Sequence, residues 1–268
     1  MIRLRDLKDI ELFLLDMDGT FYLGNKLLPG SIEFVDTLRK QGKNFMFLTN
    51  NSSNDSESYA EKLRKMGLDG KIEVFTSGDA TGIFLKERYG TLRIFLVGTK
   101  KLAKTFEKYG HKIVQEDPEI VVLGYDTEIN YEKLAKACIY LRKNLLYVAT
   151  HPDINCPSLE GPLPDAGSYI ALIEKSTGRL PDYIVGKPNP LMLEMVMKKT
   201  GVSREKIAMV GDRLYTDIEF ARRSGILSIL VLTGETTLED LRNSSIKPDI
   251  VVENIGELAK LLQKESGE

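Results

Sequence analysis

Short apolar runs alternate with amphipathic segments along most of the chain. The first run covers residues 12–15 and is followed by a helical pattern over 31–41. The same order recurs in a strand predicted at 44–48 and a helix at 56–66. Short apolar strands separated by helices are typical of a parallel sheet that is covered on both faces. The pattern therefore predicts an α/β fold.

The C-terminal part of the chain repeats this alternation. It predicts three strands and two helices, with the strands at 207–210, 226–231 and 249–252 and the helices at 216–224 and 255–263. Polar clusters follow several of the predicted strands directly. Because ligands of open α/β sheets bind at the carboxyl ends of the strands, these clusters are the candidates for a functional site.

The middle of the chain is too long to be a single connection. A crossover between parallel strands needs roughly a dozen residues, and far more lie between Asn51 and Lys187. This stretch predicts elements of its own, with strands at 94–97, 120–123 and 145–149 and helices at 100–109, 131–142 and 168–177. We therefore expect a second α/β domain, residues 78–183, to be inserted into the first.

Composition limits the classes of partner and compartment. The 268 residues include 37 Lys and Arg against 39 Asp and Glu, and this balance argues against a nucleic-acid partner. The two cysteines, Cys138 and Cys156, are too few for a disulfide framework and predict free thiols in a reducing compartment. Residues 1–10 show no apolar signal region, and no apolar run is long enough to span a bilayer. We expect a cytoplasmic protein without a membrane partner.

Two aspartates follow the first predicted strand, in the segment Asp16-Met17-Asp18-Gly19-Thr20. Residues two apart on an extended backbone point the same way, so both carboxylates can face one site. Two neighbouring carboxylates suit either a hard cation or a nucleophile paired with an acid and base. A polar exit from the strand is the simpler alternative. A calcium loop is excluded, because it needs glycine and glutamate where Phe21 and Leu27 stand.

Polar residues also end the second predicted strand and precede a later helix. The segment Thr49-Asn50-Asn51 fits a turn or a helix cap, or a cluster of hydroxyl, amide and N–H groups for phosphate oxygens. Asn189 and Pro190 fit the start of a helix. The start of a helix gives no role to Lys187, which comes just before these residues. The simple alternative is that Lys187 is a solvated lysine in a loop, as loop lysines usually are.

Two further aspartates follow the strand predicted at 207–210. Asp212 lies in the turn between that strand and the next helix, where a ligand of a cation would lie. Asp217 either joins that site or favours the N-terminus of the helix electrostatically. Strand ends therefore supply, in chain order, carboxylates, a hydroxyl with amides, an ammonium group and carboxylates again.

The order of these motifs, D-x-D-G-T, T-N-N, G-K-P and G-D-x-x-x-x-D, resembles that of the haloacid dehalogenase superfamily. The long insert between the second and third motifs is similar to the cap of its NagD-like and p-nitrophenyl phosphatase branch. The resemblance covers essentially the whole chain. It implies a Rossmann-like, doubly wound parallel sheet core of residues 1–77 and 184–268, with residues 78–183 as an inserted α/β cap domain.

The resemblance also implies a role for each motif. It makes Asp16 the nucleophile and Asp18 the general acid and base. The residues that would bind the transferred phosphoryl group are Thr49, Asn50 and Lys187.

The same resemblance implies Mg²⁺ as the cofactor. Its ligands would be Asp16, the backbone carbonyl of Asp18 and Asp212, with Asp217 bound through water or supporting the others. All of these ligands are oxygen atoms, which suit Mg²⁺ better than softer metals do.

Three residues of the insert, His151, Asp153 and Asp165, are candidates for substrate specificity. They lie in segments similar to those that meet the leaving group in this family. The branch often has asparagine where this chain has His151. A zinc site of His151 and Cys156 is disfavoured, because zinc usually takes three or four ligands.

These observations predict a magnesium-dependent phosphomonoester hydrolase that acts on small soluble phosphates through a phospho-aspartate on Asp16. Attack of a carboxylate on a phosphate dianion needs positive charge, which Mg²⁺ and Lys187 would supply. A phosphotransferase or phosphomutase would use the same site. A phospho-acceptor signalling module is the non-enzymatic alternative, but such modules lack an acid and base two residues after the nucleophile. Sustained release of phosphate would decide between hydrolase and signalling module.

Overall fold

The computed structural model describes residues 7–157 and 160–266, and their contacts divide the chain into two compact units. The first unit contains the residues up to Leu48, Ala60–Val74 and the residues from Met197 on. The second contains Thr49–Tyr59 and Phe75–Val196. The domain borders expected after residues 77 and 183 do not coincide with these divisions, and the domain assignment stays a prediction. The expected core also includes residues 1–6 and 267–268, and the expectation about a signal region rests partly on 1–6; these lie outside the described residues.

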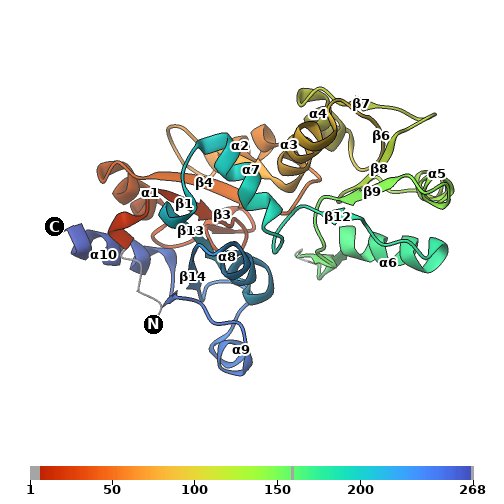
Figure 1. The fold of residues 1–268 in the computed structure, drawn as a ribbon. Helices are drawn as coiled ribbons and strands as arrows, with labels where there is room; N and C mark the ends of the chain where they lie inside the picture. The colour runs from red at the N-terminus through yellow and green to blue at the C-terminus, as the bar shows by residue number, and fades with distance from the viewer. Residues whose placement is uncertain (1–6, 158–159, 267–268) are drawn as a thin grey trace. The chain divides into compact units, whose positions relative to one another are not determined.

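A six-stranded sheet forms the centre of the first unit, in the order β15-β14-β13-β1-β4-β5. Strands β1, β4, β13 and β14 of this sheet are labelled in Figure 1. Its strands are β1 (Leu12–Leu15), β4 (Asn44–Thr49), β5 (Val74–Thr76), β13 (Ile207–Gly211), β14 (Leu227–Val231) and β15 (Ile250–Val252). The pairs β1–β13, β1–β4, β13–β14 and β14–β15 are all parallel. All four side chains of β1 are buried, which explains why its sequence is uniformly apolar instead of alternating.

Helices cover this sheet and bury their apolar stripes against it and against one another. They include α1 (Ser31–Lys40), α8 (Glu219–Ser224) and α10 (Ile255–Ser266). Helix α9 (Leu238–Asn243) buries none of its residues, and its Leu241 packs partly buried against the cluster of Leu214, Ile218 and Leu230. Helices α1 and α10 pack together, and each buries residues spaced three or four apart, such as Phe34 with Leu38 and Leu258 with Leu262. Shorter elements are η1 (Leu7–Asp9), η2 (Arg204–Lys206) and an antiparallel hairpin of β2 (Tyr22–Leu23) and β3 (Lys26–Leu27).

A five-stranded sheet forms the second unit, in the order β12-β9-β8-β6-β7. Its strands are β6 (Arg93–Val97), β7 (Lys112–Ile113), β8 (Ile120–Leu123), β9 (Leu146–Ala149) and β12 (Tyr183–Ile184), and each neighbouring pair is parallel. Its helices are α3 (Ser77–Tyr89), α4 (Lys100–Lys108), α5 (Tyr131–Arg142) and α6 (Ala166–Thr177). The aromatic side chains of Phe95 and Tyr147 pack into a core with Leu141 and Ile173 from α5 and α6.

Two helices, α2 (Ser56–Lys65) and α7 (Leu191–Thr200), include residues of both units, and a hairpin of β10 (Asn155–Cys156) and β11 (Leu163–Pro164) completes the fold. Asn189 accepts a hydrogen bond at its Oδ1 from the backbone N–H of Leu191 at 3.0 Å, as expected for a residue that starts α7.

Both cysteines are free thiols, as predicted. Among the described residues, none of the helices has the length and apolar character needed to cross a membrane.

Parallel sheets flanked by helices confirm the predicted α/β fold class. Several local expectations were incomplete. Helix α9 and the short strands β5, β7 and β12 were not predicted. The helix predicted at 216–224 begins with a π-helical turn, η3 (Leu214–Ile218), because the carbonyl of Arg213 accepts from the N–H groups of both Asp217 and Ile218. Helix α3 was not predicted at all, since its first two turns are almost completely buried and show no amphipathic stripe.

Candidate active site

The carboxyl ends of β1 and β13 are the point at which the strand order of the first sheet reverses. From β1 the chain proceeds to β4 and β5 on one side and later to β13, β14 and β15 on the other. Leu15 pairs with Val210, and the N–H of Asp16 donates to the carbonyl of Val210 at 2.9 Å. Asp16 and Asp212 therefore leave the sheet at the same edge, where doubly wound folds bind their ligands.

Three carboxylates converge at this edge. Asp16, Asp212 and Asp217 each offer one oxygen atom, and these oxygens lie within 4.8 Å of one another. Asp212 and Asp217 are buried, and Asp16 is half-buried. Within the part of the chain that the structure describes, the carboxylate of Asp18 is not one of this group. The first unit therefore brings together three of the four aspartates predicted to serve a metal.

The Asp212 side chain is fixed by its neighbours. Thr20 Oγ1 donates to Oδ1 at 3.1 Å, and the backbone N–H of Glu235 donates to Oδ2 at 2.7 Å. A β-carbon would lie 2.6 Å from Oδ2 if placed on Gly19, and 1.9 Å from it if placed on Gly234. Gly19 also has a φ of +86°, which side-chain-bearing residues rarely adopt. The glycine of the first motif is needed both for this turn and for space beside Asp212.

The charges around Asp212 do not balance. Burial raises its pKa, the carboxylates of Asp16 and Asp217 raise it further, and the result is a pKa of about 7. The N–H of Glu235 and the guanidinium of Arg213 oppose this shift only in part. Burial alone would lower the pKa of Arg213, but the surrounding carboxylates raise it overall. The excess of negative charge and the all-oxygen donor set fit a hard divalent cation.

Asp18 is half-buried in the turn after Asp16. Burial raises its pKa, the ammonium of Lys62 lowers it, and the neighbouring carboxylate of Asp16 raises it again, so that the net shift is upward. Lys62 lies on α2, with its Nζ 4.1 Å from the centre of the Tyr22 ring. Tyr22 in turn accepts at its carbonyl from the N–H of Gly19 at 2.8 Å.

Sequence reasoning missed Lys62, and the sequence held little that could have revealed it. It is one of several basic residues on an amphipathic helix, where lysines are ordinarily solvated. Thr20 and Arg213 were also not singled out, although both lie inside the aspartate motifs. The available signal was their position in the chain, Thr20 two residues after Asp18 and Arg213 directly after Asp212.

The second unit contains the residues predicted to bind phosphate. Thr49, Asn50 and Lys187 are all buried, and Lys187 is only 1% exposed although it lies in a loop. Asn50 Nδ2 donates to the backbone carbonyl of Lys187 at 2.8 Å and to Asp153 Oδ1 at 3.0 Å. Thr49 Oγ1 accepts from the N–H of Asn51 at 3.1 Å. The structure thus links Asn50 directly to Lys187, and the phosphate-binding role of these residues stays a prediction.

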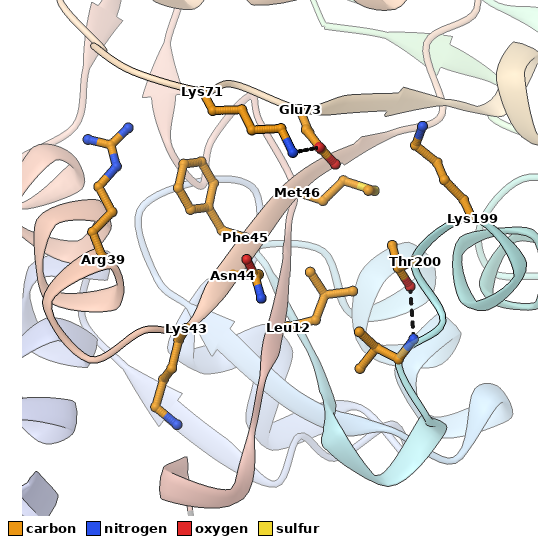
Figure 2. Close-up of a pocket in the computed structure, with 11 residues that line it drawn as sticks. Leu12, Arg39, Lys43, Asn44, Phe45, Met46, Lys71, Glu73, Lys199 and Thr200 are labelled. Carbon is orange, nitrogen blue, oxygen red and sulfur yellow. Dashed lines mark hydrogen bonds and ion pairs between the residues drawn. The ribbon is translucent and has the colours of Figure 1, made fainter.

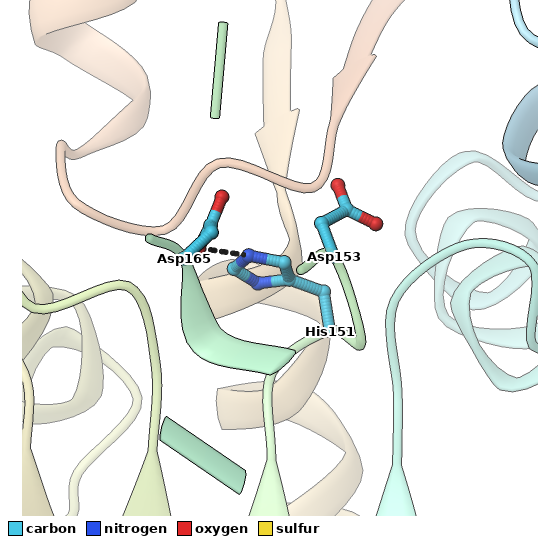
Figure 3. Close-up of side chains that lie close together, drawn as sticks. All are labelled: His151, Asp153 and Asp165. Atoms are coloured by element: carbon cyan, nitrogen blue, oxygen red, sulfur yellow. Dashed lines mark hydrogen bonds and ion pairs between the residues drawn. The ribbon is translucent and has the colours of Figure 1, made fainter. Parts of the chain in front are cut away.

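The three candidates for substrate specificity also lie together in the second unit (Figure 3). His151 is completely buried, and its Nε2 lies 2.9 Å from Asp165 Oδ1. Burial would lower the pKa of His151, but the hydrogen bond and charge of Asp165 outweigh burial and raise it. Among the described residues, Asp153 and Asp165, and not Cys156, are grouped with His151. Their role in specificity remains a prediction.

A cavity of about 450 Å³ lies elsewhere in the first unit, at the amino ends of the strands (Figure 2). It is lined in part by Leu12 and Asn44, the first residues of β1 and β4. Lys71 on its rim forms an ion pair of 2.5 Å with Glu73. The acidic cluster lies at the opposite ends of the same sheet, so this cavity is separate from it.

Comparisons with known proteins agree with this arrangement. Residues 13–112 match the model of the haloacid dehalogenase-like hydrolases, and residues 184–258 match a second model described as HAD-hydrolase-like. An acid sugar phosphatase of Staphylococcus aureus is 33% identical over 96% of this chain and 100% of its own length. The crystal structure of a 4-nitrophenylphosphatase from Thermotoga maritima has a TM-score of 0.93 and 59% identity, covering 95% of this chain and 98% of that one. NagD from E. coli K-12 has a TM-score of 0.85 and 29% identity, covering 92% and 98%.

A parallel α/β sheet with carboxylates gathered at its switch point is the ligand site of a doubly wound fold. The chain belongs to the haloacid dehalogenase-like hydrolases, in the branch of NagD and the p-nitrophenyl phosphatases. It is a phosphatase, which confirms the class of enzyme predicted from the four motifs.

Proposed function

We propose that this protein is a magnesium-dependent phosphomonoester hydrolase that forms a phospho-aspartate on Asp16. The observation that carries this proposal is the cluster of Asp16, Asp212 and Asp217 at the ends of two adjacent parallel strands. This cluster supports the proposal because a nucleophile and a cation site could share these closely spaced carboxylates. The half-buried Asp18 follows directly, with a raised pKa that suits a proton donor.

The residues that would hold Mg²⁺ are Asp16, the backbone carbonyl of Asp18 and Asp212, with Asp217 as a ligand through water or as a support. Bound there, the ion supplies the positive charge that offsets repulsion between the Asp16 carboxylate and a phosphate dianion. Asp217 is itself held by the backbone N–H of Arg213, which donates to its Oδ2 at 3.2 Å.

Asp16 and Asp18 divide the chemistry between them. An oxygen of Asp16 attacks phosphorus in line, the bond from phosphorus to the ester oxygen breaks, and Asp18 gives that oxygen its proton. Asp18 then takes a proton from water, and the resulting hydroxide attacks the phospho-aspartate. Inorganic phosphate leaves, and both aspartates return to their starting states.

Thr49, Asn50 and Lys187 would bind the phosphoryl oxygens during both steps. The hydroxyl and amide groups are neutral donors, and Lys187 is a cation held out of water. A buried cation acts more strongly on developing charge than a solvated one, because little solvent screens it.

The relatives support small soluble phosphomonoesters as the substrates, and sugar phosphates in particular. The Staphylococcus aureus relative is named an acid sugar phosphatase and matches along its whole length. We expect phosphate release from sugar phosphates and p-nitrophenyl phosphate to exceed that from nucleotides, in a screen performed with and without Mg²⁺. Absence of Mg²⁺-dependent release from every small ester would contradict the proposal.

Metal binding should depend on pH through Asp212. Its pKa of about 7 means that protons compete with the cation below neutrality. We expect the Mg²⁺ affinity of the metal-free protein, measured by calorimetry, to weaken toward about tenfold per pH unit below pH 7 for one competing proton. Exhaustive chelation should abolish hydrolysis. A constant affinity between pH 8 and pH 5.5, or full activity after chelation, would count against this site.

Lys62 should adjust the strength of Asp18 as an acid. Its ammonium favours the Asp18 carboxylate and so lowers that pKa. Lys62→Met should therefore raise the pKa of Asp18, keep the acid protonated to higher pH and move the alkaline limb of kcat/KM upward for an alkyl phosphate. Lys65→Met, which removes an exposed lysine from the same helix, is the control and should leave the profile in place. An unmoved profile in Lys62→Met would remove Lys62 from this role.

A further inference from the structure

His151 and Asp165 form a buried pair. The contacts described for this pair are all with other groups of the protein. Asp165 Oδ1 accepts from His151 Nε2 at 2.9 Å and from the backbone N–H of Ala166 at 2.5 Å, where Asp165 caps α6. The other ring nitrogen, Nδ1, lies 2.9 Å from Thr150 Oγ1 and 3.3 Å from Ser77 Oγ. His151 is 0% exposed and Asp165 is 3% exposed. Both polar ends of the imidazole are thus occupied within the second unit.

Ser77 connects this pair to the segment predicted to bind phosphate. Its hydroxyl donates to the backbone carbonyl of Asn50. Because the single proton of Ser77 is used in that bond, its oxygen faces His151 as an acceptor. An imidazole that donates from both nitrogens satisfies Asp165 and the two hydroxyl oxygens together. The raised pKa of His151 is in keeping with such a charged ring beside Asp165.

Asn50 is the point at which the network reaches Lys187. With its carbonyl held by Ser77, the Asn50 side chain donates to the carbonyl of Lys187 at 2.8 Å and to Asp153 at 3.0 Å. Ser77, Asn50 and Lys187 are each at most 4% exposed, so these bonds form away from bulk solvent. Rigid buried networks of this kind hold functional side chains in one geometry.

We infer that the His151–Asp165 pair is a positioning device, which acts through Ser77 to fix Asn50 and Lys187 for binding the phosphoryl group. His151 then touches no part of the substrate, and its effect on catalysis is indirect. The inference rests on the proposed function, because that function assigns phosphate binding to Asn50 and Lys187. It differs from the specificity role predicted for His151, which requires contact with the leaving group.

A double-mutant cycle of His151→Asn and Ser77→Ala tests this inference. Each single variant should lower kcat/KM by roughly ten- to hundredfold, as misplacement of binding groups does. The factor should be the same for p-nitrophenyl phosphate and for sugar phosphates, because the leaving group is not involved. The kcat/KM of the double variant should be no lower than that of the less active single variant, because both substitutions disrupt the same chain of hydrogen bonds. Additive losses, or a changed order of substrates, would overturn the inference.

A second readout does not depend on catalysis. The side-chain amide protons of Asn50 should be protected from exchange with water in the wild type, and the protection, measured by NMR, should fall in both single variants. Thr105→Val is the matched control, because it removes another buried hydroxyl of the second unit, one that donates to Lys101 in its own helix. Unchanged protection in His151→Asn would overturn the inference even if no substrate were hydrolysed. Loss of protection together with an inactive wild type would instead contradict only the proposed function.

Discussion

Asp18→Asn should release a burst of p-nitrophenol of at most one equivalent per active site, followed by very slow turnover. Asparagine is nearly isosteric with aspartate but exchanges no proton. The p-nitrophenolate leaving group hardly needs protonation, so attack by Asp16 survives in part. Hydrolysis of the phospho-aspartate needs a base for water, and steady turnover should fall by about 10²–10⁴-fold. Rapid-quench measurements should find acid-stable label on Asp16.

A second ester tests whether Asp18 protonates the leaving group, and a second variant tests whether Asp16 is the nucleophile. An alkyl phosphate expels a strongly basic alkoxide, so Asp18→Asn should hardly react with it even in the first step. Asp16→Asn should give neither burst nor turnover, because the nucleophile itself is lost. Mg²⁺ binding is measured alongside, since the site lies beside the substituted group. Rapid steady hydrolysis of alkyl phosphates by Asp18→Asn would remove Asp18 from the mechanism.

Lys187→Met should reduce kcat/KM by about 10²–10³-fold, as expected when a preorganised group that stabilises transition-state charge is removed. Lys187 is 1% exposed, so its ammonium acts where water screens little. Methionine keeps an unbranched apolar stem and is only one heavy atom shorter than lysine, which limits the effect of the change on packing. Circular dichroism and thermal unfolding report whether the fold is kept.

Lys175→Met is the control for the loss of a positive charge in the same unit. Lys175 is exposed on α6, and its substitution should leave kcat/KM unchanged. If Lys187→Met hydrolyses p-nitrophenyl phosphate near the wild-type rate with its fold intact, Lys187 does not stabilise the transferring phosphoryl group. A loss confined to KM would mean that Lys187 binds the ground state and the transition state equally well.

Much of the fold followed from local pattern. The run Leu12–Leu15 is a strand with every side chain buried, and Ser31–Lys40 is an amphipathic helix, as the apolar spacing predicted. Helix α3 was not predicted, because its sequence lacks such an apolar spacing. Its glycines and small polar residues are buried by neighbouring elements, so no stripe distinguishes a buried from an exposed face.

The sequence by itself determined which residues leave the carboxyl ends of the strands, because strand period and turn residues are local properties. It therefore identified Asp16, Asp18 and Asp212 as candidates, and the parallel register of β1 and β13 brings Asp16 and Asp212 to one edge of the sheet. Their catalytic and metal-binding roles follow from the family and stay to be tested by the variants above.

Only the tertiary structure decided which charges surround those residues. Lys62 acts on Asp18, Lys187 is buried in a loop, and His151 pairs with Asp165 although none of these partners is adjacent in sequence. Burial and charge pairing depend on which distant segments become neighbours, and a lysine or histidine has the same local pattern whether solvated or enclosed. The motifs thus specified the candidates for the reacting groups, while packing set the electrostatic environment around them.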